Sequence, residues 1–411
     1  MVLWRISIYD IKRGTVIMIK QIKVYLITII IFTLLLSACE PRPVAKTTAK
    51  EEKSETTIVD THSDDGRTIV GISMPDELLE RWNRDGAFLK DQFEQNGCEV
   101  ILKFANNLID TQIGDLRSMI SGGADILVIA AVDGAALSSV LEEARAANVR
   151  IIAYDRLIMK TDAVDYYVSF DNYQVGVLQA NYIIGALLMV NSDKTYNIEF
   201  ISGDPVDNNA RFFYQGALDT LQPFVDMDKI RILSTQSDFY ETSTAQWSTD
   251  IAQQRLQIIL NSYYPKGTRL DAVLCANDST ALGAARAIGA DYKGTNHVVL
   301  TGQDADIANI YNIINGTQDM TVFKALDQEA VVTVALGMAL LKGDSPAEKL
   351  IEDSNFSFEC AYNTMDYDNG IKIVPSYLLQ PVTINYQNLE KELFVTGYYR
   401  RNSSGLIYAV K

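Results

Sequence analysis

Histidine is nearly absent from this chain, whose 411 residues include only His62 and His297. A multi-histidine metal site or a His-centred catalytic triad therefore has almost no material to work with. No G-x-x-x-x-G-K-[ST], G-x-S-x-G or H-E-x-x-H motif occurs. We therefore expect no metal, no cofactor and no enzymatic activity.

Basic residues are also in deficit, because 36 Lys and Arg stand against 52 Asp and Glu, a net charge of -16. A body this acidic repels phosphate backbones, which argues against general nucleic-acid binding. Hydrophobic residues nevertheless make up 48% of the chain, enough to bury substantial cores. At roughly 150 residues per domain, the length leaves room for two or three domains.

Cysteine is sparse, and beyond Cys39 only Cys98, Cys275 and Cys360 remain. An odd, scattered set of this kind does not make a disulfide framework. Cys98 and Cys275 sit in apolar, strand-like runs, so we expect them to be small buried hydrophobic residues. A single bridge stays open as an alternative.

The N-terminus carries an apolar run at 24–36 (VYLITIIIFTLLL) that is short for a membrane-spanning helix. Lysines precede this run, and Leu36-Ser37-Ala38-Cys39, which resembles a bacterial lipobox, follows it. We predict a lipoprotein signal peptide at 1–38 and lipidation of Cys39, which would tether an exported protein to the cell membrane. The polar stretch 39–67 shows no apolar period and is predicted to be a flexible tether.

From residue 68 onwards, short apolar runs alternate with longer amphipathic stretches. Continuous apolar strands separated by helices are typical of parallel sheets covered on both faces. The helix expected at 79–96 buries Trp82, Phe88, Leu89 and Phe93 and ends before Gly97. The number of strands predicts two doubly wound α/β lobes, the second beginning near 172–190. The strand-like runs are 68–74, 99–105, 126–132, 149–155, 166–171, 197–204, 229–236, 272–278, 297–304 and 320–324.

Polar side chains recur directly after these runs, in both halves of the chain. Ligands of open parallel sheets bind beyond the carboxyl ends of the strands. Carboxylates, amides and guanidinium groups fork onto adjacent hydroxyls, so the set suits an uncharged polyol better than a phosphate. Asp133 and Asp207 are also expected as helix N-caps. The residues at strand ends are Arg81, Trp82, Asp133, Asp155, Arg156, Asp207, Asn208, Asn209, Asn277, Asp278, Gln303, Asp304 and Lys324.

Tryptophan is confined, beyond the signal segment, to Trp82 and Trp247. Indole rings stack on the apolar C–H face of a sugar while its hydroxyls point sideways to polar partners. Each ring could instead pack a core, and for Trp247 alone the two interpretations are about even.

At these residues the chain resembles the bacterial periplasmic sugar-binding proteins of ABC importers, in the branch that binds D-xylose or multiple monosaccharides. The resemblance covers about residues 68–385. Asn277-Asp278 is similar to the xylose-specific pattern, whereas Val132-Asp133-Gly134 and Phe212-Phe213-Tyr214 are similar to the multiple-sugar pattern, so the specificity stays open. The remaining matches are Arg81-Trp82, 153–158, 169–172, 206–210, 302–306, 316–318, 322–324 and 374–376.

The resemblance implies a division into two lobes joined by three crossovers, near 169–172, 323–326 and 353–360. The first lobe would comprise 68–170 plus 326–355, and the second 171–325 plus 356–388. The tail at 389–411 extends past the usual end of the family and either docks on the surface or is disordered. The implied sugar contacts are Arg81, Trp82, Asp155, Arg156, Asn208, Asn209, Trp247, Asn277, Asp304 and Lys324, with Asp133 less firmly supported.

The predicted function is therefore capture of a xylose-, glucose- or galactose-type monosaccharide and its delivery to an ABC permease. A sugar-sensing partner of a chemoreceptor or sensor kinase would use the same pocket. A nucleoside-binding lipoprotein would need an aromatic clamp, which the set supplies poorly. Glycoside hydrolysis could use Asp155 and Asp304, but Arg156 and Lys324 would keep both ionised and leave no proton donor.

Overall fold

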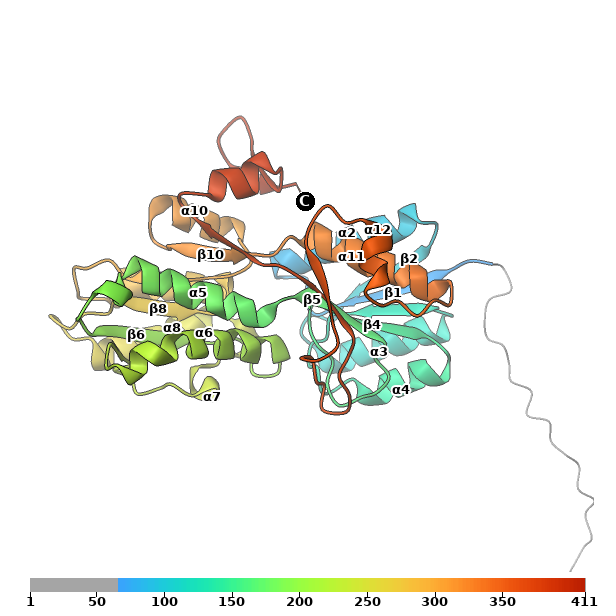
Figure 1. The fold of residues 1–411 in the computed structure, drawn as a ribbon, viewed down its shortest axis with the longest axis horizontal. Coiled ribbons are helices and arrows are strands. Elements are labelled where there is room, and N and C mark those ends of the chain that lie inside the picture. Colours follow the sequence, from blue (N-terminus) through green and yellow to red (C-terminus); the bar gives the residue numbers. More distant parts are fainter. Residues whose placement is uncertain (1–65, 411) are drawn as a thin grey trace, which may run out of the picture. The chain divides into compact units, whose positions relative to one another are not determined.

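The computed structural model describes residues 66–410, which Figure 1 draws in colour. The predicted signal peptide, Cys39 and the tether up to residue 65 lie outside the described residues, so those assignments remain predictions. Between residues 66 and 410, no helix combines the length and the apolar character needed to cross a membrane.

The first lobe is built on a seven-stranded sheet with the order β11-β12-β5-β4-β3-β1-β2. Successive residues of its strands enter different cores: Ile69 and Leu127 pack on one face, while Val70 and Val128 pack on the other. The sheet is therefore buried on both sides, as continuous apolar strands predict. Its strands are β1 (Ile69–Met74), β2 (Glu99–Phe104), β3 (Ile126–Ile129), β4 (Arg150–Tyr154), β5 (Tyr166–Phe170), β11 (Cys360–Asn363) and β12 (Ser376–Leu379), and its helices are α2 (Glu80–Gln95), α3 (Ile109–Ser121), α4 (Ser138–Ala146), α11 (Leu326–Leu341) and α12 (Lys349–Ser354).

The second lobe holds a parallel four-stranded sheet with the order β7-β6-β8-β9. Helices again lie on both of its faces, since Val273 and Leu274 of one strand enter different cores. The strands of this sheet are β6 (Tyr196–Ile201), β7 (Ile230–Arg231), β8 (Ala272–Cys275) and β9 (Val299–Leu300), and a further strand, β10 (Met320–Phe323), lies outside it. The helices are α5 (Asn172–Ala186), η1 (Met189–Asn191), α6 (Asn208–Asp226), α7 (Phe239–Thr242), η2 (Ala245–Trp247), α8 (Thr249–Tyr263), α9 (Asp278–Asp291) and α10 (Ile307–Asn315).

Every predicted strand is present, which confirms the α/β class, but β7 and β9 are only two residues long. After β7 the backbone no longer pairs with β6, because it hydrogen-bonds to the buried Glu199 side chain instead. The Glu199 carboxylate accepts hydrogen bonds from the Ser234 amide at 3.1 Å and from its hydroxyl at 2.5 Å. A buried side chain thus replaces the strand partner that an apolar run alone would predict.

The predictions for helix ends hold in two of three cases. Helix α2 ends at Gln95, and Gly97 follows with a φ of 86°. Asp207 caps α6, where its carboxylate accepts a hydrogen bond from the Asn209 amide at 3.0 Å. The cap predicted at Asp133 is wrong: α4 begins only at Ser138, and the Asp133 carboxylate accepts instead from the Ala135 amide at 2.8 Å within a turn.

The chain crosses between the lobes after β5, after β10 and between β12 and β13 (Val382–Asn385). The first two crossings lie where they were predicted. The third was predicted at 353–360, with 356–388 assigned to the second lobe, and this is wrong. Strand β12 pairs in parallel with β5 and carries β11 with it, so the chain stays in the first lobe to Leu379. Only β13, paired with β10, belongs to the second lobe.

The tail docks, which settles the alternative left open for it, as far as residue 410. It forms η3 (Glu390–Val395), β14 (Tyr399–Arg401) and β15 (Ile407–Ala409). Leu393 and Tyr399 share a buried cluster with Ile310 and Ile313 of α10. In Figure 1 this segment, in red, lies beside α10.

The cysteines behave as expected at two positions. Cys98 and Cys275 are buried free thiols, and Cys360 is a half-buried free thiol. Among the residues with assigned positions, no disulfide forms.

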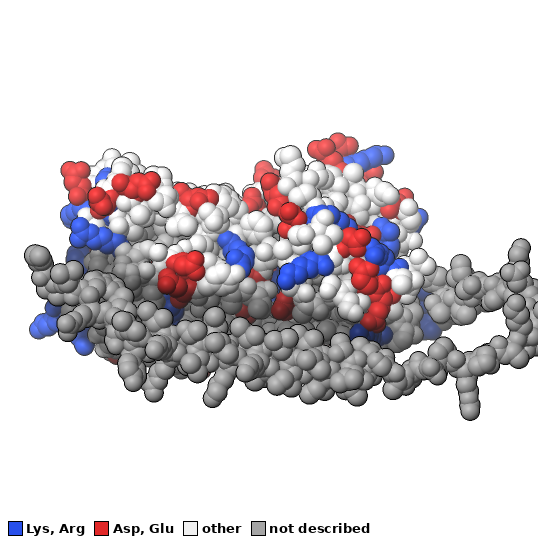
Figure 2. Space-filling view, turned by 90° about the horizontal axis from the view of Figure 1, so that it is seen from below, with Lys and Arg blue, Asp and Glu red and all other residues white. Residues whose placement is uncertain are grey.

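The surface is mixed in charge on the side that Figure 2 presents. Acidic and basic side chains are interspersed over the coloured atoms of that view, and no extended basic patch is visible among them. A nucleic-acid-binding surface would gather lysine and arginine on one face.

Candidate functional site

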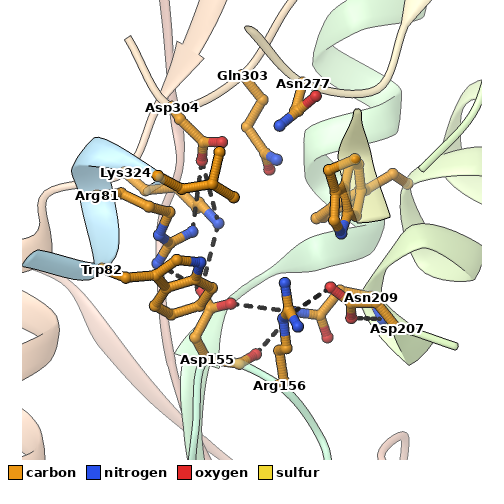
Figure 3. Close-up of a pocket in the computed structure, with 13 residues that line it drawn as sticks. Arg81, Trp82, Asp155, Arg156, Asp207, Asn209, Asn277, Gln303, Asp304 and Lys324 are labelled. Atoms are coloured by element: carbon orange, nitrogen blue, oxygen red, sulfur yellow. Dashed lines mark hydrogen bonds and ion pairs between the residues drawn. The ribbon is translucent and has the colours of Figure 1, made fainter. Parts of the chain in front are cut away.

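A cavity lies between the lobes, at the carboxyl ends of strands from both sheets (Figure 3). The free space within it is about 330 Å³, open solvent at its mouth included. The lining residues are Leu79, Arg81, Trp82, Asp155 and Arg156 from the first lobe, Asp207, Asn209, Phe213, Trp247, Asn277, Gln303 and Asp304 from the second, and Lys324 from the crossover after β10.

Most of the predicted contact residues line this cavity, but Asp133 and Asn208 are not among its lining residues. Both are half-buried, and Asn208 is the first residue of α6. A ligand contact from either residue remains a prediction without support from the cavity.

Leu79, Asp207, Phe213 and Gln303 also line the cavity, although none was predicted as a ligand contact. Signals for three of them were available. Gln303 directly precedes Asp304 at a strand end, Asp207 was among the strand-end polar residues but was expected mainly as a helix cap, and Phe213 follows Asn209 by one helical turn.

A network of buried ions holds the cavity wall together. Arg81 contacts Asp155 at 2.8 Å and Asp85 at 3.2 Å, and it reaches Asp304 of the other lobe at 3.4 Å. Lys324 lies 3.3 Å from Asp155 and 3.6 Å from Asp304. Burial works to raise the pKa of Asp155, but Arg81, Lys324 and Arg156 together outweigh it and lower the pKa to about 2. Asp155 is therefore ionised at neutral pH.

A second pair crosses the cleft between Arg156 and Asp207, whose side chains lie 3.0 Å apart. Burial raises the pKa of Asp207, and the Arg156 charge offsets only part of that rise. The backbone of Asp155 is bound across the cleft as well, because the side-chain amide of Asn209 donates a hydrogen bond to the Asp155 carbonyl at 2.7 Å. These contacts join the two lobes in a closed arrangement.

Strained backbone clusters in the cavity wall. Asp155, Trp247 and Asp304 have φ values of 55°, 55° and 100°, in the region that residues with a side chain seldom occupy. The backbone conformation of Asp155 is fixed by two hydrogen bonds, which its carbonyl accepts from the Tyr167 hydroxyl at 2.6 Å and from the Ser169 hydroxyl at 2.9 Å. Such strain persists where the surroundings fix it, commonly at ligand sites.

The two tryptophans occupy different settings. The Trp82 ring is covered by the guanidinium groups of Arg81 and Arg156, at 4.4 and 5.0 Å from its centroid. Trp247 packs against Phe213 with centroids 6.2 Å apart. Its ring fits because position 203 is glycine: a Cβ there would come within 1.9 Å of the indole.

Four buried polar atoms of the cavity residues make no hydrogen bond within the described part of the protein: the indole Nε1 atoms of Trp82 and Trp247, the Oε1 atom of Gln303, and Nε of Arg156, which has only its ion-pair contact with Asp207. Buried polar groups of folded proteins are nearly always hydrogen-bonded. The two indole nitrogens and the Arg156 nitrogen are donors and the Gln303 oxygen is an acceptor, which matches a ligand that both accepts and donates hydrogen bonds. The neighbouring charges already neutralise one another in pairs, so the ligand itself needs no charge.

Comparison with known proteins places the chain among binding proteins. The sequence profile of a family described as "Periplasmic binding protein domain" matches residues 70–345. The multiple sugar-binding periplasmic receptor ChvE of Rhizobium radiobacter is 39% identical over 80% of this chain and 90% of its own length. The D-xylose-binding periplasmic protein of Escherichia coli is 33% identical over 81% of this chain and 91% of its own.

A solved structure with high similarity is an ABC transporter solute-binding protein from Clostridium phytofermentans with bound β-D-glucose. It is 44% identical, has a TM-score of 0.76, and the match covers 82% of this chain and all of that one. A carbohydrate transporter solute-binding protein from Chloroflexus aurantiacus, in complex with D-glucose, is 30% identical with a TM-score of 0.70, over 82% of this chain and 97% of that one.

Proposed function

The chain belongs to the periplasmic binding protein family, and we propose that it captures a monosaccharide of the xylose, glucose or galactose type and delivers it to an ABC permease. The observation that carries this proposal is the set of unpartnered polar atoms in the cavity, on Trp82, Trp247 and Gln303. The names of the relatives support it, since they bind multiple sugars or D-xylose, and two solved relatives hold glucose.

The proposed mechanism is binding without chemistry. A sugar that enters the open cleft contacts Arg81 and Trp82 from one lobe and Asn209, Trp247 and Asp304 from the other. Ligand shifts the open–closed equilibrium only through its higher affinity for the closed state. The ring C–H groups would lie against the indoles, while hydroxyls take the forked contacts of Asp155, Arg156 and Asn277.

We further propose that the protein is exported and held on the cell membrane through a lipidated Cys39. This rests on the lipobox-like Leu36-Ser37-Ala38-Cys39 sequence. A multiply acylated cysteine anchors a protein stably, whereas one chain binds only marginally. Such an anchor would keep the binding protein near a membrane permease. In the alternative function, a chemoreceptor or sensor kinase would bind the same closed form of the two lobes.

The test is a titration of the purified protein with aldoses and nucleosides, followed by calorimetry and tryptophan emission. We expect saturable binding of xylose, glucose or galactose. Asp304→Asn should weaken it about 10- to 100-fold, because a charge-assisted hydrogen bond of about 1.5–3 kcal/mol is lost. Asp250→Asn is the matched control, since the Asp250 side chain is 81% exposed and is not among the lining residues of the cavity.

Two other outcomes would contradict the proposal. Saturation by a nucleoside, with no response to any sugar, would make it a nucleoside-binding lipoprotein. Equal loss in Asp304→Asn and Asp250→Asn would mean that the cavity is not the binding site.

A further inference from the structure

Tyr399 of the C-terminal tail makes two hydrogen bonds that join the lobes outside the ligand cavity. Its hydroxyl accepts a hydrogen bond from Arg84 Nη1 at 2.9 Å and donates one to the Ala305 carbonyl at 2.7 Å. Arg84 lies in α2 of the first lobe, and Tyr399 lies 315 residues later in β14. Tyr399 is fully buried and does not line the cavity.

Both partners of this hydroxyl adjoin residues of the proposed binding site. Arg84 follows Arg81 by three positions on α2, so it lies on the adjoining turn of the same helix. Ala305 directly follows Asp304, and both have positive φ values, 56° and 100°. The Tyr399 hydroxyl therefore connects the helix that presents Arg81 and Trp82 to the strained turn that presents Asp304.

We propose that Tyr399 is a positioning residue for ligand binding: it holds the Asp304 turn against α2 and thereby stabilises the closed lobes. This inference rests on the proposed function and extends it to the tail, which contributes nothing to the cavity lining. The Arg81–Asp304 contact of 3.4 Å crosses the cleft beside it, so the two connections close together.

The surroundings keep Tyr399 in one place and in one protonation state. Its side chain packs in the cluster formed by Leu393, Ile310 and Ile313, and its backbone pairs with Ala409. The Arg84 guanidinium also lies over its ring, 5.5 Å from the centroid. Burial raises the pKa of Tyr399, so the hydroxyl keeps the proton that it donates to Ala305.

The neighbouring tail residue reaches the first lobe as well. Gln328 of α11 donates to the Tyr398 hydroxyl at 3.1 Å, and the Tyr398 ring packs on Phe323 with centroids 4.7 Å apart. Phe323 ends β10, directly before the crossover at Lys324. The tail thus contacts the first lobe both at the hinge and at α2, which is the placement expected of an element that stabilises closure.

Tyr399→Phe tests the proposal, because it removes the hydroxyl and leaves the packed ring. We expect the sugar Kd to rise about tenfold, with the dissociation rate rising and the association rate nearly unchanged. Loss of a buried hydrogen-bond partner should also lower the unfolding midpoint of the ligand-free protein, so the selective rise of the dissociation rate, which a merely structural role would not produce, is the readout that separates positioning from a structural role. Tyr408→Phe, in the paired strand β15, is the matched control, because Tyr408 is 44% exposed.

Arg84→Gln removes the Arg84–Tyr399 hydrogen bond from the side of the first lobe and leaves the core of the tail intact. It should weaken binding to the same degree, and the double variant should lose no more than either single variant. Additive losses, or unaltered affinity in Arg84→Gln, would overturn the inference whatever Tyr399→Phe does. If the unmodified protein binds sugar and Tyr399→Phe binds it equally well, only this inference fails. If the unmodified protein binds no sugar, the proposed function fails too.

Discussion

Asp155 is the residue on which the charges of the cavity converge. It lies 2.8 Å from Arg81 and 3.3 Å from Lys324, and its side chain is almost completely buried. A carboxylate paired in this way stabilises the fold only while it is ionised. Its pKa is lowered from an ordinary value near 3.8 to about 2. The stabilisation is therefore present above pH 4 and is lost as the pH falls through 2.

Asp155→Asn should lower the free energy of unfolding by about 3 kcal/mol at pH 7, because two buried cations lose a partner. The difference between variant and unmodified protein should shrink as the pH falls from about 4 towards 2, because the carboxyl group of the unmodified protein becomes protonated over this range and below it. Urea denaturation at pH 7, 4 and 2.5 measures this. A difference that is constant over the three pH values would contradict the assignment of Asp155 as the paired, ionised group.

At the scale of elements, the packing of α5 on α6 fixes part of the cavity wall. The helices meet at glycines: a Cβ on Gly176 would lie 1.9 Å from the Phe213 carbonyl, and one on Gly216 would lie 2.1 Å from the Tyr173 carbonyl. Helix α6 carries Asn209 into the cavity. The position of that side chain therefore depends on backbones that can approach this closely.

Gly176→Ala should destabilise the protein by about 1–3 kcal/mol, because the helices must separate, and sugar affinity should fall with the shift of Phe213. Gly185→Ala, on the same helix but with open space around it, should be neutral or stabilising by up to about 1 kcal/mol. Thermal unfolding and sugar titration of the pair decide the point. Equal stability of the two variants would show that the contact is not constrained.

At the scale of the whole body, the structure shows a cleft held closed by contacts between lobes. Arg81–Asp304, Arg156–Asp207 and Asn209–Asp155 all cross it. Each connects lobes whose covalent links are the three crossovers. Separation of the lobes by hinge rotation breaks these contacts without disturbing either sheet.

Sugar at 100 times its Kd should stabilise the protein by about 2.7 kcal/mol, since it binds the folded state alone. It should also reduce the radius of gyration in small-angle scattering, because the closed lobes are more compact. Saturable binding with an unchanged radius would mean that the lobes are already closed without ligand.

The sequence predicted the elements and most of the polar residues that line the cavity, because both are local properties. A buried parallel strand is a continuous apolar run, and its carboxyl end is marked by the next polar residue, so Asp155, Asn277 and Asp304 could be located. Phe213 was missed because an aromatic residue on a helix is usually core, and Leu79 gave no signal.

Pairing and orientation were decided only by the tertiary structure. Whether β12 joins β5 or the second lobe depends on an edge formed some two hundred residues earlier along the chain, so the third crossover was misplaced. The hydrogen bonds of Tyr399 likewise depend on the tail, whose strands are too short to show a hydrophobic period in the sequence. Local sequence thus determined the strands, helices and polar strand ends, whereas contacts between distant segments decided how they close around the cavity.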